Sequence, residues 1–360
     1  MLVTETVSSG IIAACRVLNN RQLGALALRI GSAVGIRKDE RVANIAEQIK
    51  LLHSLSKIRE QKGMLSVTSI DIGIANFAYC RMEWSKGSTA PTLIELDKVS
   101  LQRQFAHILA ADKSLSAPVT ADMGFELTES LSNISQLPDI FTIERQRARS
   151  MSSKTVLEPV LRANILEQVL FSGLVNKQRW SPGMRDRYKV LSSDPQRMTK
   201  YWCERKDTFP VHIQETPQYL KLMIKRATST TANTNKLTKM IKMFLAKDVL
   251  RTAVHDEHHS LVSLSPKSRL IFQKIPNITT MDYSLYDTLG MDPSQSGARK
   301  DDDLADSFLH ALAWMQWLQS LDQLTPLLPK DPANITAVEK ERFIQHIKSF
   351  MPSLETKAHR

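Results

Sequence analysis

Two acids stand where predicted β-strands end. Asp71 closes a β-branched run over residues 65–71, and Glu144 closes a short apolar run over residues 139–144. If the first and fourth strands of a sheet are parallel neighbours, these carboxylates emerge side by side at its carboxyl edge, where open α/β sheets form their ligand sites. We therefore predict a site that combines Asp71 with Glu144.

A further group of acids opens a strongly apolar helix near the C-terminus. Asp302 and Asp306 are four residues apart and Asp303 and Asp306 three apart, so either pair points to one side of a helix. Converging carboxylates repel one another unless cations hold them, and hard oxygen ligands suit Mg²⁺ or Mn²⁺. Two such ions about 4 Å apart can activate water and stabilise the leaving oxygen of a phosphodiester. The acids thus predict metal-dependent phosphodiester hydrolysis.

Each acid also has a structural interpretation. Asp71 could be a turn acid, Glu144 an ion-pair partner of the arginines that follow it, and residues 301–303 could favour a helix N-terminus through capping and the macrodipole. The order of the three acidic positions around strand patterns favours the catalytic interpretation.

Basic and polar residues adjoin these acids. Arginine forks match phosphate oxygens, although a solvated basic loop is the alternative for the segment after Glu144. An asparagine shortly after Asp71 could donate a hydrogen bond to DNA or to the acids, or simply form a turn. The predicted DNA contacts near the site are Asn76, Arg145, Gln146, Arg147 and Arg149.

Composition limits the class of protein. A net charge of +11 favours a polyanionic partner. Three separated cysteines without a Cys-x-x-Cys motif argue against a disulfide framework and a zinc knuckle. No apolar run approaches the roughly 20 residues of a membrane helix, so no membrane association is expected. The first 41 residues contain Glu5, Asp39 and Glu40 and make a poor mitochondrial presequence.

Local patterns suggest three regions. Residues 1–60 are predicted to form a helical hairpin whose glycine-containing corner presents Arg37, Lys38 and Arg41 to solvent, or a hairpin that only packs on the rest of the protein. Residues 61–320 carry the strands, a long helix over 154–177, and an insertion at about 251–299 that we predict to be a loop. Residues 321–360 are predicted to form a link and a terminal helix.

Three ordered blocks, residues 69–80, 143–150 and 300–307, closely resemble the fungal mitochondrial Holliday junction resolvases, which are related to the bacterial RuvC resolvases. The resemblance implies an α/β fold with a ribonuclease H-like mixed five-stranded sheet flanked by helices. A looser similarity over residues 18–50 implies a small SAP-like DNA-binding hairpin. The resemblance to the resolvases also implies a mitochondrial homodimer that makes paired nicks in four-way DNA junctions and leaves 5′-phosphate and 3′-hydroxyl ends. We assign the helix over 154–177 to part of the dimer interface.

Carried over by this resemblance, Asp71, Glu144, Asp302 and Asp306 would be catalytic and hold two Mg²⁺ ions, with Mn²⁺ as a substitute. Asp303 is the rival of Asp302, and the additional Asp301 blurs that assignment. The same family is similar to a mitochondrial intron-splicing factor, so a non-catalytic RNA-binding protein on this fold is the alternative. A ribonuclease acting on RNA–DNA hybrids is a weaker third interpretation.

Overall fold

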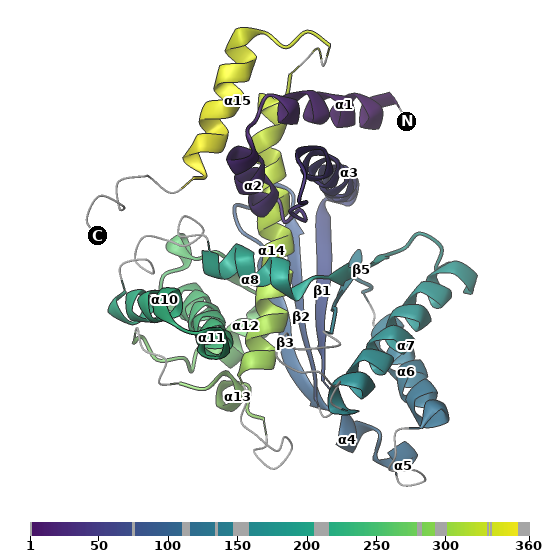
Figure 1. Cartoon of the computed structure of the whole chain (residues 1–360). Helices are drawn as coiled ribbons and strands as arrows, with labels where there is room; N and C mark the ends of the chain where they lie inside the picture. Colours follow the sequence, from purple (N-terminus) through teal and green to yellow (C-terminus); the bar gives the residue numbers. More distant parts are fainter. Residues whose placement is uncertain are drawn as a thin grey trace. The chain divides into compact units, whose positions relative to one another are not determined.

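The computed structural model divides into two compact units, and Figure 1 shows the chain with its helices and strands labelled. Unit 1 comprises the described parts of Met1–Gly63, Gln196–Gln214 and Ala313–Arg360, and unit 2 those of Met64–Pro195 and Glu215–Leu312. The N-terminal helices thus share a unit with two later segments of the chain. The three regions predicted from the sequence place these segments apart from the N-terminal helices. The structure describes residues 2–73, 76–109, 116–133, 136–146, 158–204, 216–278, 283–291, 301–329, 331 and 333–351.

Unit 2 is built on a six-stranded mixed sheet with the order β5-β4-β1-β2-β3-β6. β2 runs antiparallel to β1 and β3, whereas β4 is parallel to β1 and β5 is parallel to β4. The predicted α/β fold with a ribonuclease H-like sheet is confirmed. The strands are β1 (Met64–Ile72), β2 (Asn76–Ser85), β3 (Thr92–Ser100), β4 (Ile140–Glu144), β5 (Lys189–Ser193) and β6 (Ser263–Leu264).

The sheet has six strands instead of the predicted five because a two-residue strand joins its edge. Ser263 and Leu264 of β6 pair in parallel with Thr92 and Leu93 of β3. So short a strand has no periodicity of its own, and only its neighbour in space defines it.

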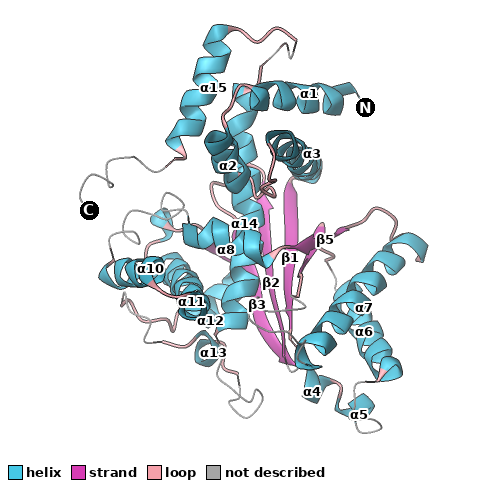
Figure 2. Ribbon diagram, in the orientation of Figure 1, coloured by secondary structure: helices cyan, strands magenta, loops and turns pink. Residues whose placement is uncertain are grey.

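Helices cover the sheet on both sides, with α4 to α7 on one side and α10 to α13 on the other (Figure 2). The predicted long helix is α7, and it packs on α6 at two glycines, Gly124 against Val169 and Gly173 against Thr128. A buried hydrophobic core around Ile70 joins these two helices to the sheet. The helices are α4 (Leu101–Gln104), α5 (Ala106–Leu109), α6 (Ala117–Ser132), α7 (Glu158–Trp180), α10 (Pro217–Thr228), α11 (Thr231–His255), α12 (Pro266–Phe272), α13 (Leu285–Thr288) and α14 (Asp302–Leu324).

The prediction of a long loop over residues 251–299 is wrong for most of the described part of this segment. α11 continues to His255, and the 3₁₀ helix η1 (Glu257–His259), β6, α12 and α13 follow. Two of these short helices start at serine caps, because the Ser265 and Ser284 side chains accept hydrogen bonds from backbone N–H groups. Residues 279–282 and 292–300 lie outside the described residues.

Unit 1 is helical. Its turn after α2 packs on α14, where a Cβ on Gly31 would lie 2.1 Å from the Trp317 ring. The Arg197 guanidinium donates to the Gly31 carbonyl at 2.7 Å, and the Tyr201 and Trp317 rings meet edge to face. Tyr201, Trp202, Trp314 and Trp317 are buried. The helices are α1 (Leu2–Arg16), α2 (Asn20–Arg29), α3 (Lys38–Lys62), α8 (Pro195–Glu204), the later part of α14, η2 (Thr325–Leu327) and α15 (Ala337–Ser349).

Two further expectations concern the whole chain. Cys15, Cys80 and Cys203 are free thiols in buried positions, as expected without a disulfide framework. In the described part of the chain, no helix has the length and apolar character needed to cross a membrane.

Candidate active site

Three of the predicted acids meet at one edge of the sheet in unit 2. Ile70 of β1 and Ile143 of β4 lie opposite each other in parallel register, so the next residues, Asp71 and Glu144, emerge side by side. Asp306 reaches them from the first turns of α14, and one ligand oxygen from each of the three carboxylates lies within 4.8 Å of the other two. This separation suits shared coordination of a cation.

The charges of this acid cluster act on one another. Burial raises the pKa of Asp71 well above its ordinary value, and the carboxylates of Glu144, Asp306 and Asp303 raise it further, while Lys242 opposes this shift. Three oxygen donors under mutual repulsion form a donor set that fits a hard divalent cation, because the cation removes the repulsion and replaces lost hydration. Asp71, Glu144 and Asp306 therefore fit Mg²⁺ or Mn²⁺.

The other aspartates near the start of α14 differ in their surroundings. The Asp301 carboxylate is buried and binds Lys247 at 2.8 Å, the Ser284 hydroxyl at 3.1 Å and the Tyr286 N–H at 3.0 Å. These contacts account for the additional acid, because they anchor residues that precede α14.

Asp302 and Asp303 lie outside the cluster of three. Asp302 pairs with Lys239 at 2.8 Å, and Asp303 pairs with Lys98 at 2.8 Å. Among these two, only Asp303 contributes to the raised pKa of Asp71. The electrostatics thus favour Asp303 over Asp302 as the acid that faces the cluster.

The residues that follow β4 contact the site in part. The Gln146 carboxamide donates to Asp71 at 3.2 Å, while its backbone N–H donates to Glu167 at 2.8 Å. The Arg145 guanidinium is 60% exposed and lies 3.2 Å from Asp194. Asn76 is placed by the turn after β1, where its carbonyl accepts the Gly73 N–H at 2.8 Å. Arg147 and Arg149 lie outside the described residues.

The predicted basic corner is only partly exposed. Arg37 and Lys38 are exposed in unit 1, with the Lys38 ammonium 3.1 Å from the Arg16 carbonyl. Arg41 is instead half-buried, and its guanidinium donates to the Gly35 and Asn20 carbonyls at 2.7 and 2.9 Å. The expectation that Arg41 is presented to solvent is therefore wrong, because its side chain holds the turn together.

Sequence reasoning missed the cations and the histidine that face the acids. Lys98, Lys239 and Lys242 come from β3 and α11, and His310 lies 3.5 Å from Glu144 with 3% of its surface exposed. His310 follows Asp306 by four residues, so helical spacing was an available signal. Lysines at positions 236, 239 and 242 likewise recur at a helical interval.

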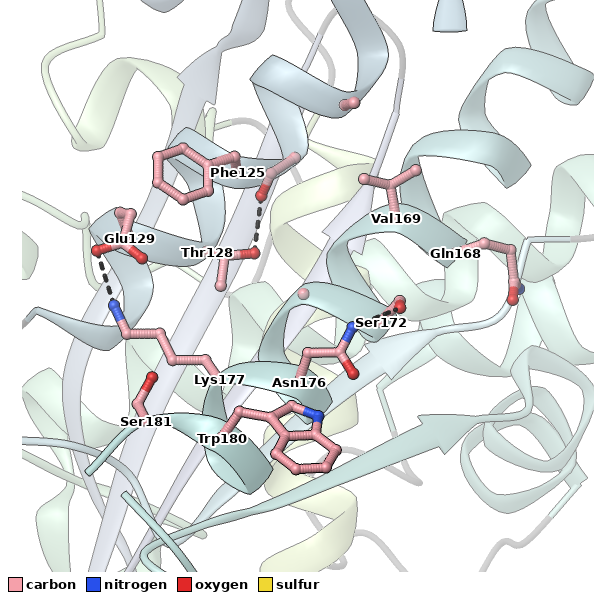
Figure 3. Close-up of a pocket in the computed structure, with 13 residues that line it drawn as sticks. Phe125, Thr128, Glu129, Gln168, Val169, Ser172, Asn176, Lys177, Trp180 and Ser181 are labelled. Atoms are coloured by element: carbon pink, nitrogen blue, oxygen red, sulfur yellow. Dashed lines mark hydrogen bonds and ion pairs between the residues drawn. The ribbon is translucent and has the colours of Figure 1, made fainter. Parts of the chain in front are cut away.

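A separate hollow lies between α6 and α7 (Figure 3). It has a volume of about 620 Å³ and is lined by side chains that include Phe125 and Trp180, which are 65% and 80% exposed. The Glu129–Lys177 ion pair, 2.7 Å long, closes part of it. None of the clustered acids lines this hollow, so it is not the candidate metal site.

The fold and the acid cluster together define a ribonuclease H-like α/β protein with a carboxylate site of the kind that supports nuclease chemistry. Comparison with known proteins gives the family. The chain belongs to the family described as mitochondrial resolvase Ydc2 / RNA splicing MRS1, whose model matches residues 67–324.

One relative is the mitochondrial cruciform cutting endonuclease 1 of Saccharomyces cerevisiae. It is 36% identical over 321 residues, which cover 87% of this chain and 86% of the relative. Two solved structures of Thermus thermophilus RuvC, one in complex with a Holliday junction substrate, are 12% and 11% identical, each with a TM-score of 0.22. The matches cover 39% and 40% of this chain and 69% and 72% of the two RuvC chains.

Proposed function

We propose that this protein is a structure-selective endonuclease that resolves four-way DNA junctions by paired phosphodiester hydrolysis, leaving 5′-phosphate and 3′-hydroxyl ends. The observation that carries the proposal is the convergence of Asp71, Glu144 and Asp306 at the sheet edge. The cruciform-cutting activity in the name of the yeast relative supports this substrate class. That relative is mitochondrial by name, and we assign this protein to mitochondria as well.

In this proposal, Asp71, Glu144 and Asp306 would hold two Mg²⁺ ions, with Mn²⁺ as a substitute, and Asp303 would be the next candidate ligand. When bound, the ions polarise a water and stabilise the leaving oxygen. Gln146 orients Asp71 through its carboxamide, and His310 lies beside Glu144.

DNA contacts complete the proposed site. The exposed Arg145 guanidinium is suited to a backbone phosphate, and Asn76, Arg147 and Arg149 remain predicted contacts of the same kind. In unit 1, Arg37 and Lys38 are the exposed residues of the SAP-like hairpin that we propose to contact the DNA arms.

Paired nicks require two sites on one junction, and we propose a homodimer that supplies them. The prediction that α7 forms part of the interface is supported by the exposed Phe125 and Trp180 on either side of the α6–α7 hollow. Large apolar side chains exposed together on one face are typical of association surfaces.

The alternative is a non-catalytic RNA-binding factor, because the family description also includes RNA splicing. The acid cluster favours the nuclease. A protein that only binds nucleic acid gains nothing from buried, mutually repelling carboxylates beside a phosphate-binding face.

A cleavage assay separates the two functions. The protein is incubated with an end-labelled four-way junction, with Mg²⁺ or with a chelator, alongside a linear duplex of the same sequence. We expect symmetric nicks in the junction only, and only with Mg²⁺. Tight binding of intron RNA combined with an intact junction under all metal conditions would instead support the splicing alternative.

A further inference from the structure

A set of lysines faces the acids of the candidate active site. Each of four aspartates near the start of α14 pairs with a different lysine. Three of these lysines belong to α11 and one belongs to β3. The pairs are Asp301–Lys247, Asp302–Lys239, Asp303–Lys98 and Asp306–Lys242. Lysine side chains of the protein therefore already neutralise part of the negative charge at the candidate active site.

Lys242 is distinguished from the other lysines by its partner. Asp306 is the one member of the cluster of three that α14 supplies, and the Lys242 ammonium lies 2.5 Å from its Oδ1 atom. Both side chains are 13% exposed, so water screens this pair weakly. Lys239 also pairs with an aspartate of α14, but its side chain is 60% exposed and Asp302 lies outside the cluster.

A divalent ion and an ammonium group compete for the same carboxylate. Mg²⁺ binds carboxylate oxygens at about 2.0–2.1 Å, and a cation at that distance from Asp306 would strongly repel an ammonium in contact with the same group. The lysine side chain has four flexible carbons, so its charged end can move without a change in the helix.

We propose that Lys242 is a built-in counter-cation that holds Asp306 in the metal-free protein and gives up this contact when a divalent ion binds. The proposal rests on the proposed function in so far as Asp306 is a metal ligand. The exchange makes metal binding weaker than the carboxylates alone would allow, and it frees an ammonium group beside the acid cluster. Lys242 is thus a positioning residue for Asp306.

The test is the affinity of the full-length, DNA-free protein for Mn²⁺, measured by titration calorimetry. Lys242→Gln should bind Mn²⁺ about tenfold more tightly than the unmodified protein, the scale expected when a weakly screened unit charge a few ångströms away is removed. In chelator its Tm should be lower, because Asp306 loses its partner, and saturating Mn²⁺ should remove this difference. Lys242→Arg keeps the charge and should stay close to the unmodified protein.

Lys239→Gln is the matched control, since it removes the same charge from the same helix at a pair outside the cluster. Its Mn²⁺ affinity should change less than about threefold. Equal tightening in both variants, or unchanged or weaker affinity in folded Lys242→Gln, would overturn the proposal. Should the glutamine variant not fold, Lys242→Met keeps the aliphatic stem and serves the same comparison.

The two proposals fail in different ways. If the unmodified protein neither binds Mn²⁺ nor cleaves the junction, the proposed function fails. If it binds and cleaves but Lys242→Gln shows no tighter binding, only the role of Lys242 fails.

Discussion

Asp71 is the residue on which the electrostatics of the site centre. It is the next-to-last residue of the central strand β1, it lies beside Glu144 and Asp306, and its pKa is raised well above the ordinary value by burial and by these charges. Without a cation, the ionised cluster costs folding free energy. With one, the same repulsion becomes affinity for the metal.

Removing one acid at a time separates binding from chemistry. Asp71→Asn and Glu144→Gln should each bind a four-way junction with an unchanged Kd, because these side chains would hold metal and not phosphate. Cleavage should fall by at least about 100-fold, since several kcal/mol of charge stabilisation depend on the ions. Gel shift and single-turnover cleavage measure the two effects, and loss of binding together with an altered circular dichroism spectrum would mark the acids as structural.

The raised pKa of Asp71 predicts how stability depends on pH. Between its unfolded value near 3.8 and its higher folded value, the folded protein binds more protons than the unfolded chain. The free energy of unfolding of the metal-free protein should therefore fall as pH rises through this window.

Calorimetric Tm values in chelator from pH 4 to 8 test this dependence. Asp71→Asn should lack this part of the fall, so its Tm should overtake that of the unmodified protein as pH increases. Parallel Tm curves for the two proteins would contradict the raised pKa of Asp71 in the folded protein.

The sequence predicts the acids better than their neighbours. Asp71 and Glu144 were identifiable because each lies at the end of a recognisable strand, and Asp306 because it lies near the start of an apolar helix. The lysines were not, because an exposed and a paired lysine look alike in a sequence and Lys98 and Lys242 meet the acids only through tertiary structure. Arg41 was misjudged for the same reason, since its carbonyl partners lie in other segments.

At the scale of elements, the start of α14 is held by Asp301. This buried carboxylate binds Lys247, Ser284 and Tyr286, and so connects α14 to α11 and to the start of α13. Asp301, for which the sequence analysis predicts no role, therefore positions the helix that carries Asp306.

Replacing Asp301 should accordingly affect folding more than chemistry. Asp301→Ala leaves the buried Lys247 ammonium without this partner and should lower the free energy of unfolding by about 3–5 kcal/mol. Asp302→Ala is the matched control, because the more exposed Lys239 pair should contribute no more than about 1 kcal/mol. Urea unfolding of both variants measures the difference, and equal losses would count against the anchoring role.

The elements that the sequence missed are short. α12 and α13 contain seven and four residues, and β6 contains two, so none is long enough to show hydrophobic periodicity. The serines that cap α12 and α13 can be recognised in the sequence. However, a serine that is not followed by a periodic apolar pattern is equally typical of a loop.

At the scale of the whole molecule, unit 1 joins three segments that are distant in the sequence. The region boundaries at 60 and 320 follow local composition and do not reflect this association. Gly31 and Arg197 both contact Trp317. Local sequence patterns cannot predict such contacts, because they join segments that are distant in the sequence.

This organisation changes how the proposed DNA role of the N-terminal helices is best tested. Deleting residues 1–60 would expose the buried Trp317, so charge reversal is cleaner. Arg37→Glu with Lys38→Glu should weaken junction binding and lower the slope of log affinity against log salt concentration by about 2, with turnover of bound junction unchanged.

The matched control lies on α15 of the same unit. Lys340→Glu with Arg342→Glu reverses the same number of exposed charges on an element that is not part of the hairpin. If the salt slopes of the two double variants are equal, the corner has no specific part in DNA binding.

The most direct test of a shared metal site is a crystal structure determined with Mn²⁺, in which anomalous scattering locates the ions. We expect Mn²⁺ bound by carboxylate oxygens of Asp71, Glu144 and Asp306 together, and no such signal in Asp71→Asn crystals soaked in the same way. Saturating Mn²⁺ that leaves these three carboxylates without an ion, or an ion held equally well without Asp71, would contradict the proposed chemistry.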